Sequence, residues 1–183
     1  MTQTSSTRTF RCTGIARPDL LGPPPMDLVV LAHDERRVRR TVLTLVHGDR
    51  VALDLPDTVM LRHGTRLVLE GGREVQVIAA EEELLEVSAP DELRLLELAW
   101  HLGNRHVPLA LSFERSGERL IAPPRLLIAR DPVLARMLEG LGASLREVIE
   151  PFEPVAGAYH SHGHSHDHHP PGDDTLLAQG PAR

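Results

Sequence analysis

The chain of 183 residues contains no lysine, a single cysteine and few aromatic residues. All 20 basic residues are arginine, which excludes mechanisms that require a lysine, such as a P-loop phosphate clamp or a Schiff base. The one cysteine, Cys12, excludes an intramolecular disulfide and a metal site made of several cysteines. Aromatic residues make up 3% of the chain, so the core must be built from the aliphatic side chains within the 41% apolar content.

Long hydrophobic runs and an excess of positive charge are also absent. No apolar run approaches the roughly 18–20 residues of a membrane span, and the polar N-terminus lacks the apolar stretch of a secretory signal. The net charge of −6 and the shortage of rings for base stacking argue against a general nucleic-acid binder. We therefore expect a cytoplasmic protein without a membrane or nucleic-acid partner.

Short apolar segments separated by turns predict an all-β domain over residues 1–80. Residues 51–55 carry apolar side chains at every second position, which is the period of a strand. Residues 66–70 and 74–79 flank a double glycine at 71–72, and this pattern is typical of a β-hairpin.

Two arginine pairs lie on either side of Val38 in this domain. Arg36-Arg37 and Arg39-Arg40 are expected to form the exposed, charged face of a strand, which would prevent aggregation through a sheet edge. A surface for an acidic partner is the functional alternative.

The second half alternates strand and helix patterns and predicts a ferredoxin-like βαββαβ domain over residues 81–153. Pro90 and Asp91 open the first helix. Asp131-Pro132 opens the second, with aspartate at the N-cap and proline at the first helical position. The predicted strands cover residues 82–88, 106–113, 119–128 and 143–152.

The details of this domain give further expectations. Pro123-Pro124 must lie at an edge or a bulge of the third strand, because proline has no N–H to donate to a sheet. A turn is expected at residues 115–117. The side chains predicted to form the apolar helix faces are Leu93, Leu96, Leu98, Trp100 and Leu102 in the first helix, and Val133, Leu134, Met137, Leu138 and Leu141 in the second.

Residues 154–183 are rich in polar and small residues and in proline, and they predict a flexible tail without a core. The tail also carries histidines, and the imidazole side chain suits nickel, copper and zinc ions. Metal sites can form in the tail only if it folds around the ion, which predicts several exchangeable ions of modest affinity. A purification tag and a neutral low-complexity tail are the alternatives. Six of the 11 histidines lie here, and we call them the tail histidines: His160, His162, His164, His166, His168 and His169.

The remaining histidines are scattered. His101 falls at a helix end, where a structural role is the default, and His106 falls at a strand start, where ligand and structural roles stay open. His33, His47 and His63 are expected on the surface of the β domain. No nucleophile elbow or glycine-rich phosphate loop is present, so the sequence does not predict an enzyme.

Taken together, these motifs resemble the UreE family of urease accessory metallochaperones. The match runs over residues 9–169, which is most of the chain. It consists of five ordered motifs followed by the histidine-rich tail: residues 54–56 (DLP), 101–108 (HLGNRHVP), 131–138 (DPVLARML), 151–154 (PFEP) and 157–159 (GAY).

The resemblance implies a homodimer that carries Ni(II) to the urease assembly complex, with the urease accessory GTPase and the urease apoprotein as partners. It also implies that the N-terminal β domain contacts partner proteins and that two copies of His106 grip one metal at the dimer interface. Zn(II) and Cu(II) are expected to bind in vitro as well. Some members carry extra histidines before the second helix of the metal domain; here only Asp131 could contribute to such a site.

Two other functions compete with delivery. The tail alone would suffice for a protein that stores or buffers metal without a specific acceptor. A small metal-dependent hydrolase would have to use His101 and His106, together with a further ligand that the sequence does not reveal.

Overall fold

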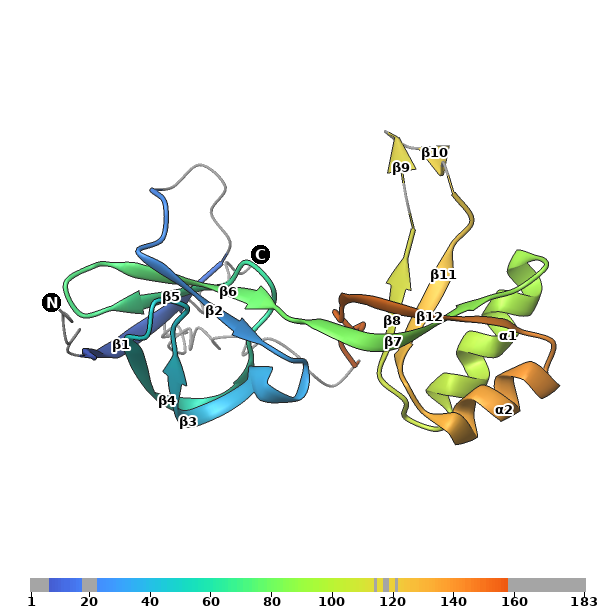
Figure 1. The fold of residues 1–183 in the computed structure, drawn as a ribbon, viewed down its shortest axis with the longest axis horizontal. Coiled ribbons are helices and arrows are strands. Elements are labelled where there is room, and N and C mark those ends of the chain that lie inside the picture. Colours follow the sequence, from blue (N-terminus) through green and yellow to red (C-terminus); the bar gives the residue numbers. More distant parts are fainter. Residues whose placement is uncertain (1–6, 18–22, 114, 117–118, 121, 158–183) are drawn as a thin grey trace, which may run out of the picture.

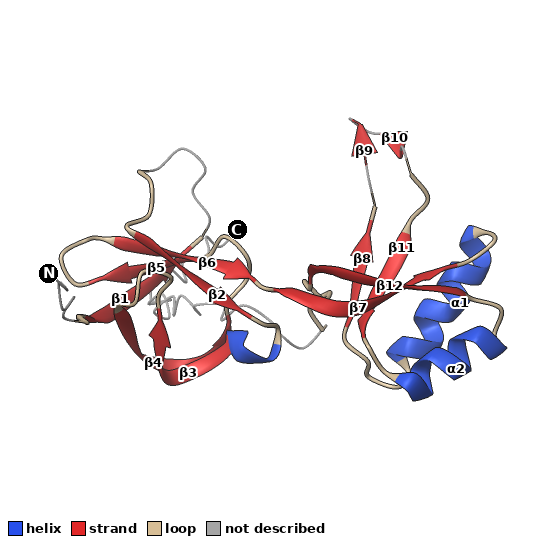
Figure 2. Ribbon diagram, in the orientation of Figure 1, coloured by secondary structure: helices blue, strands red, loops and turns tan. Residues whose placement is uncertain are grey.

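The computed structural model describes residues 7–17, 23–113, 115–116, 119–120 and 122–157, which form two domains side by side (Figure 1). The first domain contains strands only, apart from one short 3-10 turn, and the second packs two helices on a sheet (Figure 2). The expected α+β class, with a β domain followed by a βαββαβ domain, is confirmed. Residues 158–183 of the predicted tail, with all six tail histidines, lie outside the described residues, whereas residues 154–157 are described.

The N-terminal domain is one six-stranded sheet in the order β2-β6-β5-β1-β4-β3. Alternate side chains of its strands point inward, and Val51, Leu67, Val75 and Val77 are completely buried. The sheet is mixed, because β1 pairs with β4 and β2 with β6 in parallel, whereas the other pairs are antiparallel. The strands are β1 (Thr9–Ala16), β2 (Asp27–Leu31), β3 (Arg37–Thr44), β4 (Arg50–Met60), β5 (Arg66–Leu69) and β6 (Glu74–Ala79).

The second domain has the ferredoxin-like strand order β12-β7-β11-β8, with all neighbours antiparallel. Both helices cover one face of this sheet and share a core with it. The short strands β9 (Arg115–Ser116) and β10 (Arg119–Leu120) pair with each other beyond β8 and β11. The main elements are β7 (Glu81–Ser88), α1 (Glu92–Gly103), β8 (Leu109–Ser112), β11 (Arg125–Ala129), α2 (Pro132–Gly140) and β12 (Ser144–Pro151).

Three local expectations for this domain were wrong. Arg115 and Ser116 form β9 and not a turn. The third strand is not continuous over residues 119–128, because Pro123-Pro124 separates β10 from β11. The strand expected from residue 106 begins only at Leu109, because the preceding residues complete the end of α1.

The predicted face of α1 was also partly wrong. Leu95, Leu98 and Leu102 face the sheet and are buried. Leu93, Leu96 and Trp100 are exposed by 69%, 68% and 65% of their surface, and Val133 at the start of α2 is equally exposed. The two leucine sets have the same i, i+3, i+7 spacing, so helical periodicity alone could not tell which one meets the sheet.

The two domains meet at a 3-10 turn, η1 (Asp34–Arg36), which precedes β3. Arg36 was expected on an exposed strand face, yet it is 1% exposed, and its guanidinium bonds to Glu153 and to the carbonyl oxygen of Phe152. His33 is half-buried rather than on the surface, and its ring packs edge-on against Phe152 at 5.3 Å.

The other two histidines of the β domain are exposed, as expected. His47 Nδ1 lies 2.7 Å from Asp27 Oδ1. His63 Nδ1 accepts a hydrogen bond from the Ala79 N–H at 3.3 Å. Within the described part of the chain, every helix is too short or too polar to span a bilayer.

The half-buried His33 predicts a pH effect on stability. Burial lowers the pKa of His33 below its ordinary 6.5, and Arg36 lowers it further, whereas Glu82 and Asp34 oppose the shift. The unfolded chain therefore takes up this proton at a higher pH than the folded protein, so the free energy of unfolding falls as the pH drops below about 6.5. Urea denaturation at neutral pH and at about pH 5.5 should show a smaller loss for His33→Gln than for the wild type. Equal losses would contradict this.

Candidate metal centre

His106 occupies the position just beyond the C-terminal end of α1 and has a left-handed backbone conformation. Its φ is +54°, and it is the one non-glycine residue with positive φ among the described residues. Its N–H donates to the Gly103 carbonyl oxygen at 2.9 Å, and the Val107 N–H donates to the Leu102 carbonyl oxygen at 3.2 Å. This pair of bonds defines a Schellman motif with His106 at the position that usually carries glycine.

The end of α2 provides an internal comparison. The Gly142 N–H donates to the Glu139 carbonyl oxygen at 2.9 Å, and the Ala143 N–H donates to the Leu138 carbonyl oxygen at 3.0 Å. Gly142 has φ +84° and holds the same place as His106. Because glycine adopts this conformation without steric cost, the imidazole at 106 is kept at the expense of backbone strain. Strain of this kind often accompanies function.

The backbone around His106 is firmly held while its side chain is exposed. Leu102 is completely buried, and Val107 packs against the same helix-and-sheet core. The Schellman bonds tie His106 between these two anchors. The imidazole is therefore presented to solvent from a fixed point, which suits a ligand that must remain accessible.

His101 lies one turn earlier and has a different environment. Its ring is half-buried and contacts the Trp100 ring edge-on at 5.0 Å. Its backbone carbonyl oxygen accepts a hydrogen bond from the Arg105 guanidinium at 3.0 Å. The hydrogen bond uses the backbone of His101, so the structural role of its imidazole stays a prediction.

Asp131 is engaged as a helix cap. Its Oδ1 accepts hydrogen bonds from the Val133 N–H at 2.7 Å and the Leu134 N–H at 3.0 Å, as its predicted N-cap position requires. In the described part of one chain, no three histidine, cysteine or acidic side chains gather where they could share an ion.

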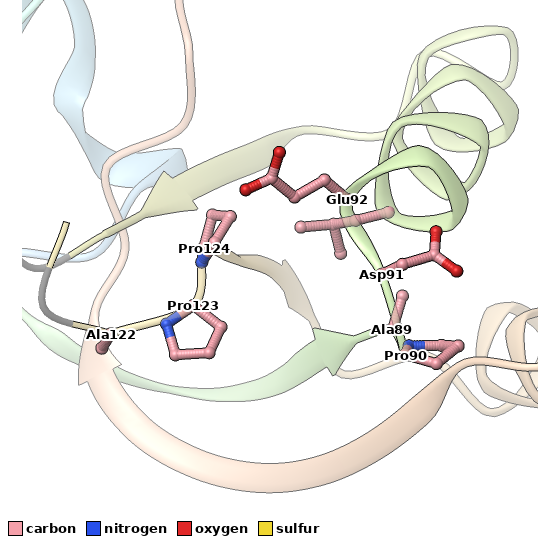
Figure 3. Close-up of a pocket in the computed structure, with 8 residues that line it drawn as sticks. Ala89, Pro90, Asp91, Glu92, Ala122, Pro123 and Pro124 are labelled. Atoms are coloured by element: carbon pink, nitrogen blue, oxygen red, sulfur yellow. The ribbon is translucent and has the colours of Figure 1, made fainter.

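A pocket of about 430 Å³ lies at the opposite end of α1 from His106 (Figure 3). Asp91 Oδ1 caps α1 by accepting a hydrogen bond from the Arg94 N–H at 2.8 Å, so this carboxylate is already engaged. The lining contains no histidine or cysteine and consists of Ala89, Pro90, Asp91, Glu92, Leu95, Ala122, Pro123 and Pro124. The pocket is therefore not a candidate metal centre.

Sequence reasoning placed His106 at the start of a strand and missed its role in ending α1. A signal was present, since Leu102 and Val107 form an apolar pair that flanks the left-handed residue, as Leu138 and Ala143 do around Gly142. Glycine normally marks this position, so a histidine there does not indicate a helix end.

These features define a two-domain protein in which a ferredoxin-like domain presents one exposed histidine from a strained helix end. Two family models match the chain: the N-terminal domain of the UreE urease accessory protein over residues 16–80, and its C-terminal domain over residues 82–174. The chain belongs to the UreE family of urease accessory proteins, non-enzymatic nickel chaperones of urease maturation.

Two curated relatives agree with this assignment over most of their length. The UreE protein of Agrobacterium fabrum is 50% identical over 147 residues, which covers 80% of this chain and 85% of the relative. The UreE protein of Rhizobium meliloti is 48% identical over 160 residues, covering 87% and 97%. The family resemblance drawn from the motifs is thereby confirmed.

The strained backbone at residue 106 predicts that His106→Gly stabilises the metal-free protein. Removing the side chain from this left-handed backbone position should raise the free energy of unfolding by about 1 kcal/mol. Gly142→His introduces the same strain at the end of α2 and should lower it by a similar amount. Urea denaturation in the presence of a chelator would measure both changes. A less stable His106→Gly protein would show that the imidazole makes stabilising contacts of its own.

Proposed function

We propose that this chain acts in the cytoplasm as a homodimer that binds Ni(II) through two copies of His106 and through its tail histidines. It passes the ion to the urease apoprotein complex together with the urease accessory GTPase. The observation that carries this proposal is the exposed imidazole of His106 at a position that glycine would fill without strain. Residues 1–80 then serve for partner contact, residues 81–153 for metal binding and dimerisation, and residues 154–183 for metal capture.

The outer face of α1 supports a dimer. Leu93, Leu96 and Trp100 form an exposed apolar stripe that runs along α1 towards its C-terminal end, where His106 lies. Exposed apolar stripes of this kind are typical of interfaces. A second copy packed on this stripe about a two-fold axis would bring the two imidazoles towards each other.

Two imidazoles from two subunits suit a carrier. A single imidazole holds nickel weakly, but a pair that dimerisation has already brought together acts as a chelate. The remaining coordination positions stay open to water or to tail histidines, so an acceptor can displace them one at a time. Imidazole also binds Zn(II) and Cu(II), and selection for nickel then depends on supply and geometry.

Storage without an acceptor is the second candidate, and the tail histidines favour it because a tail alone could hold ions. The two functions differ in their partners. A pull-down with nickel-loaded protein should recover urease subunits and the accessory GTPase if the protein delivers metal. Failure to recover either from cells that express all of them would favour storage.

Nickel counts in a series of variants test the two kinds of site. Truncation after Tyr159 should remove most of the bound nickel but leave one tight ion per dimer, because the tail histidines are lost and His106 remains. His106→Ala in the truncated protein should abolish that ion, whereas His101→Ala should change its affinity much less. Equilibrium dialysis gives these counts. A tight ion that survives His106→Ala would make His101 the next candidate.

The apolar stripe predicts the effect of a charge at its C-terminal end. Trp100→Glu should convert the dimer to a monomer and remove the tight nickel ion, while the ions on the tail remain. Val42→Glu is a matched control, because Val42 is an exposed valine, 56% accessible, on β3 of the other domain. Analytical ultracentrifugation combined with dialysis would check both variants. A Trp100→Glu protein that stays dimeric would move the interface elsewhere.

A further inference from the structure

Residues 152–157, which we call the strap, follow β12 and contact both domains. Phe152 is 1% exposed and packs against Leu84, Ala110 and Leu127, on the sheet face opposite the helices. Further along, the Val155 N–H donates to the Leu109 carbonyl oxygen at 2.8 Å. The strap is therefore attached to the first residue of β8.

The N-terminal domain holds the same strap through Arg36. This guanidinium, 2% exposed, donates to the carbonyl oxygen of Phe152 and to Glu153 Oε1. Glu153 Oε1 also accepts a hydrogen bond from the His63 N–H at 3.2 Å. A buried guanidinium stays charged and needs its acceptors in fixed positions, so this clasp holds the strap in a defined place.

The clasp is a second connection between the domains, in addition to the chain itself. β6 ends at Ala79 and β7 begins at Glu81, so the covalent link is a single residue. Next to this link, the His33 N–H of the first domain donates to Glu82 Oε1 of the second at 2.8 Å. The covalent link and the packing of His33 on Phe152 would persist if the clasp opened, but the strap would lose its ion pair with the N-terminal domain.

The strap ends where the histidine-rich tail begins. Gly157 is its last residue, and His160 follows three residues later, a reach of at most about 10 Å. At its other contact, Leu109 lies three residues after His106. The strap therefore attaches the root of the tail to the segment that carries His106.

We propose that Arg36 is a positioning residue for nickel delivery: its clasp with Phe152 and Glu153 keeps the root of the tail at the start of β8. A short tether of this kind raises the effective concentration of tail-bound ions at the site formed by His106. This inference rests on the proposed function. It adds that the N-terminal domain contributes to metal transfer within the protein, through a residue that binds no metal.

The test compares Arg36→Met with the wild type in the full-length dimer. Neither side chain is a nickel ligand, so the number of bound ions should not change. Transfer from the nickel-loaded protein to the apo-urease complex should slow several-fold, and hydrogen exchange of the Val155 amide should rise by about tenfold. Arg11→Met is the matched control, because Arg11 is an exposed arginine on β1 for which no ion pair is found among the described residues.

A second background separates positioning from a merely structural role. In a full-length chain whose six tail histidines are replaced by serine, no tail ions remain to be positioned. Arg36→Met should then leave the transfer rate unchanged, since the two changes act on one step and are not additive. An equal slowing in both backgrounds, or a wild-type rate for Arg36→Met with intact tail histidines, would overturn the positioning role.

Two further results keep the outcomes distinct. If Arg36→Met fails to fold, Glu153→Gln tests the same clasp, because it keeps an acceptor for the His63 N–H but removes the charge opposite Arg36. Glu153→Gln should also slow transfer, and a wild-type rate would count against the proposal.

If the wild-type protein itself transfers no nickel, the proposed function is what fails. Unchanged Val155 exchange in Arg36→Met would separately show that Arg36 does not hold the strap.

Discussion

The buried guanidinium of Arg36 is the contact on which the arrangement of the two domains depends. The guanidinium is removed from water, and the carbonyl oxygen of Phe152 and the carboxylates of Glu153 and Glu82 compensate its charge. Loss of these partners would be costly, because the buried guanidinium would be left charged and unpaired. The pairing therefore constrains where β12 ends, where the strap runs and how the first domain meets the second.

Helix α1 combines three tasks on one short segment. Its inner leucines fill the core over the sheet, and its outer stripe of Leu93, Leu96 and Trp100 is exposed and forms the proposed surface for a second copy. Its last turn places His106. Because all three depend on the same helix, packing, association and metal binding are coupled: a change that rotates α1 would disturb the core and the proposed metal pair together.

The site that emerges is open rather than enclosed, in keeping with a carrier. A structural metal site surrounds its ion with protein ligands, whereas this domain presents one exposed imidazole from a hydrogen-bonded helix end. In the proposed function the remaining ligands come from a second subunit, the tail or water. Rigidity of the backbone lowers the ordering cost of binding, and incomplete coordination allows release. The strained backbone at residue 106 thus accompanies an imidazole that is accessible to solvent.

Local chemistry in the sequence was enough to predict the βαββαβ order, the helix start at Pro90-Asp91, the cap at Asp131, the hairpin at residues 71–72 and the family motifs, because each depends on residues close together in the chain. Other features required the tertiary structure. Two apolar stripes of equal spacing lie on α1, and either could face the core. Only the packing of α1 on the sheet shows that Leu95, Leu98 and Leu102 are the buried set. Arg36 reads as an exposed strand arginine until Glu153, 117 positions away, supplies its counter-charge. Burial of a charge depends on partners that folding brings from a distance, and no local pattern records them.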